Sequence, residues 1–153
     1  ALIGTPRRTG PGAFNNAGHE LNQYVVGHCL DYPEGDWQEA LREVVDKLYR
    51  PSSPAVRDEL AELFAAVELT CLYNDVPLCM RWVSESHPYP PLSYATPFKR
   101  LRYQREMERH QAQAERLAGD LRGEERRENL LAGFAGTLAR TDEMVAQSLA
   151  EEA

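Results

Sequence analysis

The fold is decided by residues 107–145, which read MERHQAQAERLAGDLRGEERRENLLAGFAGTLARTDEMV. Two series of mostly apolar side chains in this stretch step alternately by three and four residues: Met107, His110, Ala114, Leu117 and Leu121, then Leu131, Phe134, Leu138, Thr141 and Val145. This spacing is typical of an amphipathic, coiled-coil-like helix. The sequence therefore predicts that residues 98–153 form a long helical segment, packed on the rest of the chain or on a partner.

The two series are separated by a short break. Gly119 and Gly123 lower the helix propensity there, and the charged run Glu124–Glu128 follows. Either one interrupted helix or a helical hairpin fits this pattern. The two glycines favour the hairpin.

Residues 14–85 are predicted to form a compact bundle of short helices. Candidate helix starts lie at Asn15 or Asn16, at Asp36 with Glu39, at Ser53-Pro54 and at Asp75. No alternating pattern typical of a strand lasts more than four positions. The predicted fold class is therefore all-α.

Two segments rich in proline or glycine fall outside these helices. Residues 1–13 are expected to be a flexible arm, and residues 86–97 an extended connector with four prolines. The connector contains a candidate linear motif for a partner: Tyr89, Pro90, Pro91 and Leu92. An ordinary connector between helices is the alternative interpretation of this segment.

The charge is acidic overall but uneven. The formal net charge is −7, which disfavours affinity of the whole chain for nucleic acid. Residues 99–127 nevertheless carry nine basic and six acidic side chains. Candidate polyanion contacts are Arg7, Arg8, Lys99, Arg100, Arg102, Arg105 and Arg109. The alternative is a solvated helix face with ion pairs, because Glu106 and Glu108 interleave with the arginines.

The three cysteines and four histidines give no local signature of a metal or catalytic site. The closest pair is the adjacent His28 and Cys29, whose side chains diverge by about 100° on a helix. A Cys/His-dependent enzyme stays open as an alternative, with no residues assigned. The sequence predicts no cofactor and no metal, and the odd cysteine count indicates free thiols in a reducing, intracellular compartment. No apolar run approaches the roughly 18 residues of a membrane span.

The function predicted from these features is a non-enzymatic helical interaction and assembly module. Its surface is expected to be the C-terminal apolar stripe: Met107, Leu117, Leu121, Leu131, Phe134, Leu138 and Val145. We expect self-association or a helical partner, because the stripe presents more apolar surface than the short N-terminal helices could cover. A nucleic-acid-binding regulator or packaging protein is the first alternative.

Overall fold

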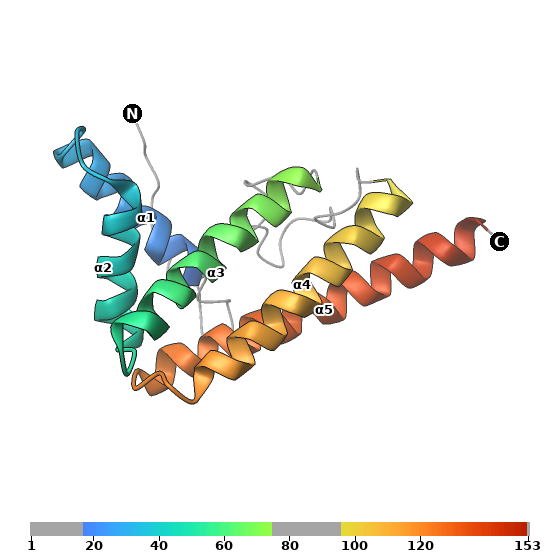
Figure 1. The fold of residues 1–153 in the computed structure, drawn as a ribbon. Coiled ribbons are helices and arrows are strands. Elements are labelled where there is room, and N and C mark those ends of the chain that lie inside the picture. Colours follow the sequence, from blue (N-terminus) through green and yellow to red (C-terminus); the bar gives the residue numbers. More distant parts are fainter. Residues whose placement is uncertain (1–16, 75–95, 153) are drawn as a thin grey trace, which may run out of the picture.

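Five helices follow one another in a computed structural model that describes residues 17–74 and 96–152 (Figure 1). They are α1 (Ala17–Asp31), α2 (Trp37–Tyr49), α3 (Pro54–Tyr73), α4 (Pro97–Ala118) and α5 (Glu124–Glu152). No strand occurs within these two ranges, so the predicted all-α fold class is confirmed. The candidate arm 1–13, the fourth helix start at Asp75 and the connector as far as residue 95 lie outside the described residues.

Capping side chains set the starts of α2, α3 and α4. Asp36 accepts a hydrogen bond from the Gln38 N–H at 2.8 Å and caps α2. The Ser53 hydroxyl accepts from the Val56 N–H at 3.3 Å, just before the proline that opens α3. Thr96 does the same for Lys99 at the start of α4, again before a proline. Each cap satisfies a backbone donor that a helix leaves without an internal partner.

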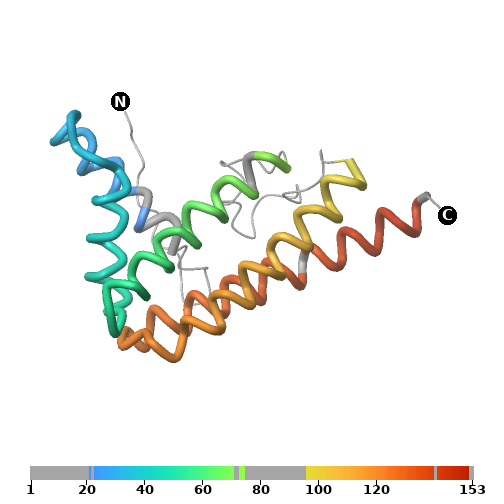
Figure 2. The backbone as a smooth tube through the Cα atoms, viewed as in Figure 1, coloured from blue at the N-terminus to red at the C-terminus, as the bar shows by residue number. Residues whose placement is uncertain are grey.

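The C-terminal segment is a helical hairpin. Helix α5 returns along α4, and α3 lies along the other side of α4 (Figure 2). The turn between α4 and α5 is held by the turn between α2 and α3. The Arg122 N–H donates to the Arg50 carbonyl at 3.1 Å, and the Gly123 N–H donates to the Tyr49 carbonyl at 3.0 Å. The hairpin is thus anchored to the first half of the chain by backbone contacts.

One apolar core is shared by all five helices. It includes Leu21 of α1, Val45 of α2, Leu60 of α3, Leu117 of α4 and Phe134 of α5, each at most 6% exposed. The half-buried ring of Phe64 packs on the buried ring of Tyr49, with 5.5 Å between centroids. Burial of this apolar surface is the main force that holds the helices together.

The predicted interaction stripe lies in this core. Six of its seven side chains are buried within the single chain, and Leu131 is half-buried against the core: Met107, Leu117, Leu121, Phe134, Leu138 and Val145. The chain therefore covers the stripe itself. The expectation that a partner is needed to cover these residues is corrected, because α4 and α5 pack on each other and on the N-terminal helices.

Candidate functional site

Large apolar side chains remain exposed in two parts of the described chain. One group is Val26, Leu30, Tyr32 and Trp37, at the end of α1 and the start of α2. The other group is Leu69, Tyr73, Phe98 and Leu149, near the end of α3, the start of α4 and the end of α5. Figure 1 places the turn between α1 and α2 at the opposite end of the molecule from the C-terminus of α5. The two groups are therefore separate surfaces.

The first group belongs to a surface that we call the α1–α2 tip, residues 30–39. Every residue of the tip is exposed, including Leu30 at 66%, Tyr32 at 63% and Trp37 at 48%. Burial resumes at Ala40, from which α2 faces the core. Exposed aromatic side chains gathered in this way are typical anchors of protein interfaces.

The tip is also purely acidic. Four exposed carboxylates lie in it: Asp31, Glu34, Asp36 and Glu39. No lysine or arginine occurs between Arg8 and Arg42. The apolar anchors are thus surrounded by negative charge, with no basic side chain of the tip to neutralise it.

A hollow of about 300 Å³ lies beside the tip on α1. It is lined by two parallel rows of side chains, each with a spacing of four residues: Gln23, Gly27 and Asp31, and Tyr24, His28 and Tyr32. A β-carbon built on Gly27 would meet no heavy atom within 4 Å, so the missing side chain leaves the space open. The hollow combines an aromatic wall with a carboxylate at one end.

The aromatic wall is held in place by ring contacts and by α2. The rings of Tyr24 and His28 are stacked at 6.5 Å, and those of His28 and Tyr32 lie 5.2 Å apart. The Lys47 ammonium donates to the Tyr24 hydroxyl at 2.9 Å and to the Glu43 carboxylate at 2.7 Å. Glu43 is the larger cause of the raised pKa of Lys47, and Tyr24 adds to it.

A second polar arrangement joins α3 to α4. The amide of Asn74, fully buried, donates to the Thr70 carbonyl at 2.7 Å and to the Glu106 carboxylate at 3.0 Å, and it accepts from Arg102 at 2.7 Å. One helical turn further along α4, the His110 imidazole meets the Thr70 hydroxyl at 2.8 Å. Burial lowers the pKa of His110.

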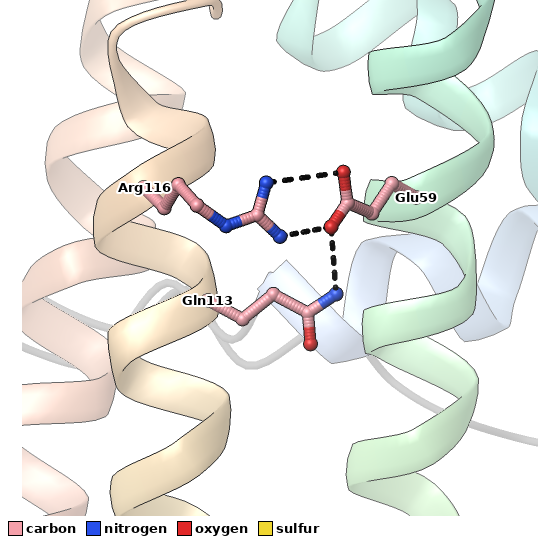
Figure 3. A network of polar contacts seen from close by, with 3 residues as sticks. All are labelled: Glu59, Gln113 and Arg116. Carbon is pink, nitrogen blue, oxygen red and sulfur yellow. Dashed lines mark hydrogen bonds and ion pairs between the residues drawn. The ribbon is translucent and has the colours of Figure 1, made fainter.

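The same pairing of helices continues near the other end of α3. Glu59 of α3 receives hydrogen bonds from both Gln113 and Arg116 of α4 (Figure 3). Arg116 lowers the pKa of the Glu59 carboxyl. These contacts align α3 with α4. We therefore assign them to structure.

The predicted basic cluster is divided among different surfaces. Arg100 bonds the Ser148 hydroxyl of α5, whereas Arg102 turns to α3 and donates to the Tyr73 carbonyl at 2.5 Å. Arg105 and Arg109 are exposed on α4 with Glu108 between them in sequence, and Lys99 is half-buried. The helix thus directs its arginines to α3, to α5 and to solvent. Arg7 and Arg8 lie outside the described residues.

The other predicted candidates give no site among the residues that the structure describes. Cys29 is a half-buried free thiol, and the ring of the preceding residue, His28, contacts the rings of Tyr24 and Tyr32. Among the described residues, no group of three or more histidine, cysteine and carboxylate side chains could hold a metal. The candidate motif Tyr89, Pro90, Pro91 and Leu92 lies outside the described ranges. No helix in residues 17–74 and 96–152 has the length and apolar character of a membrane span.

The sequence reasoning missed the tip, although one signal for it was present. The 33 positions between Arg8 and Arg42 hold five acidic and no basic side chains (lysine or arginine), with Tyr32 and Trp37 among them. A one-sided charge run with aromatic residues indicates a surface that selects its partner by charge. No protein-family model, no curated protein and no solved structure matches the chain.

Proposed function

We propose that this chain is a non-enzymatic helical interaction module whose protein partner docks on the α1–α2 tip. The observation that carries the proposal is the exposure of Leu30, Tyr32 and Trp37 within ten consecutive exposed residues. Removing such a side chain from water contributes roughly 1.5–3 kcal/mol. Three anchors of this size supply the apolar centre that a specific interface needs.

We assign partner binding to the tip and not to the C-terminal stripe. The stripe is covered by its own chain, so its area gives no reason to expect a second copy there. The tip projects from the core on two helix ends that are fixed at their inner halves by Leu21 and Val45. A preorganised surface of this kind loses little conformational entropy on binding.

The two alternative functions have less support. Nucleic-acid binding requires a basic face, but the exposed arginines of α4 alternate with Glu108 and Glu115, and the tip is acidic. A Cys/His-dependent enzyme requires a thiol beside a base. Cys29, the cysteine whose side chain the structure describes, is half-buried, and the neighbouring His28 contacts two tyrosine rings.

Selection from a random-peptide library tests the proposal. We expect the wild-type chain to enrich peptides whose binding falls at least tenfold in the double variant Leu30→Ser/Trp37→Ser. The matched control is Phe98→Ser/Leu149→Ser, which removes apolar side chains from the other exposed group and should leave binding unchanged. Enrichment of peptides that bind the tip variant equally well, or of none at all, contradicts the proposal.

A further inference from the structure

We infer that the hollow on α1 receives a basic side chain of the docked partner, which makes the partner an amphipathic segment that carries arginine or lysine. This inference rests on the proposed function, because it names the chemical class of the partner that the tip binds. Three observations carry it: the open space over Gly27, the position of Asp31 and the charge of the tip.

The hollow is an open site on the protein surface and not an enclosed cavity. About 300 Å³ is open along one face of a single helix, and the space exists because Gly27 interrupts the row that Gln23 and Asp31 flank. Leu30 and Tyr32 follow directly in the tip. A partner segment that buries its apolar side chains on the tip therefore brings its neighbouring side chains to the hollow.

The walls favour a cation. The Asp31 carboxylate is exposed at one end of the hollow and can accept a charge-assisted hydrogen bond. Tyr24, His28 and Tyr32 line the side, and aromatic rings attract ammonium and guanidinium groups. An arginine fits both features, because its planar guanidinium pairs with carboxylates and stacks on rings.

The existing cation near the hollow does not fill this role. Lys47 approaches the Tyr24 ring at 5.1 Å, but its ammonium is paired with Glu43 at 2.7 Å. Lys47 comes from α2 and is not among the residues that line the hollow. Asp31, Glu34, Asp36 and Glu39 leave the tip with four negative charges to attract a basic segment.

Three synthetic peptides of 18 residues serve as probes. The first is helical, with leucine on one face and arginine on the other; the second replaces every arginine by glutamate; the third replaces every leucine by serine. Titration of each labelled peptide with the full chain, followed by fluorescence anisotropy, gives the affinities. We expect the first peptide to bind at least about tenfold more tightly than either of the others, and more weakly as salt is raised.

Two substitutions locate the site. Gly27→Met fills the hollow with an uncharged side chain that helices favour, and Asp31→Asn removes the carboxylate without changing its shape. Each is expected to weaken binding of the first peptide about fivefold to tenfold. The matched controls are Gly133→Met, at an equally open helix position of α5, and Glu143→Gln, at an exposed acid of α5. Both controls should bind like wild type.

The outcomes separate this inference from the proposed function. If the affinity depends on Leu30 and Trp37 but is unchanged by Gly27→Met and Asp31→Asn, the inference is overturned and the proposed docking surface is retained. Equal binding of the glutamate peptide also overturns it. Dimer formation by the chain alone, lost in Asp31→Asn on sedimentation, would make a second copy the occupant and overturn the assignment of a separate partner. Loss of peptide binding in both hollow variants but neither control supports the inference.

Discussion

Gly123 lies where the turn between α4 and α5 meets the end of α2. A β-carbon built there would lie 2.7 Å from the Leu48 carbonyl oxygen and 3.1 Å from that of Tyr49. These are backbone atoms at the end of α2, so they cannot move aside as a flexible side chain would. A residue without a β-carbon is therefore needed here so that the turn can lie against the end of α2.

We predict that Gly123→Ala lowers the free energy of unfolding by about 1–3 kcal/mol, the usual cost of overpacking. Gly119→Ala is the control, since a β-carbon there meets nothing within 4 Å. Urea denaturation of both variants measures the difference. Equal stability of the two variants would contradict the close approach of the turn to α2.

His110 makes the stability depend on pH. Burial lowers its pKa from 6.5, Glu106 opposes this shift, and Arg109 adds to it. A lowered pKa in the folded state means that the unfolded chain binds the proton more readily. The stabilisation is therefore complete above pH 6.5 and is lost as the pH falls through the folded-state pKa.

We predict a smaller loss of stability between pH 7.5 and 5.0 in His110→Gln than in wild type. Glutamine does not titrate in this range and can still contact the Thr70 hydroxyl, which lies 2.8 Å from His110 in wild type. Urea denaturation at the two pH values gives the comparison, in which the other titrating groups cancel. An identical pH dependence in wild type and His110→Gln would show that protonation of His110 does not destabilise the fold.

At the level of elements, α3 and α4 are paired through Asn74. Its side chain is fully buried, donates both amide hydrogens and accepts a hydrogen bond at its oxygen. Its removal therefore breaks the hydrogen bonds that Glu106 and Arg102 make to it. We predict that Asn74→Ala costs about 2–3 kcal/mol of stability. Gln111→Ala, which breaks one exposed bond within α4, should cost under about 0.5 kcal/mol. Thermal unfolding distinguishes the two.

The elements themselves could be predicted from the sequence, but their pairing could not. Asp36 and Ser53-Pro54 mark helix starts because capping is local, and the glycines between the apolar series indicate the hairpin. Periodicity shows which face of a helix is apolar, but it does not show what covers that face. Periodicity therefore left open whether the chain itself or a partner covers the stripe through Leu117 and Phe134, and the structure shows both side chains buried within the chain.

The same limit applies to the charged residues. Lys99 to Arg109 are neighbours in sequence, but rotation along α4 sends Arg100 towards α5 and Arg102 towards α3. The exposure of the α1–α2 tip could not be predicted, because exposure is a tertiary property. Trp37 continues the apolar face of α2, yet it lies beyond the point at which the core covers that face.

At the scale of the whole molecule, the five described helices share one core, and this should make their unfolding cooperative. Side chains from all five helices contribute to this core, Leu117 and Phe134 among them, and Phe134 is 6% exposed. We predict that Phe134→Ala costs about 3–5 kcal/mol, because it removes an aromatic ring and leaves a cavity. The stability of α1, α2 and α3 should fall by the same amount, although the substitution is in α5.

Amide hydrogen exchange resolved by helix measures this coupling. In Phe134→Ala, the most protected amides of α2 and α3 are expected to exchange faster by about the same factor as those of α4 and α5. Leu149→Ala, which truncates a side chain that is 52% exposed, should change none of them. Protection retained in α2 and α3 but lost in the hairpin would mean that the N-terminal helices hold the α1–α2 tip without help from α5. A uniform loss would instead make the rigidity of the docking surface a property of the entire chain.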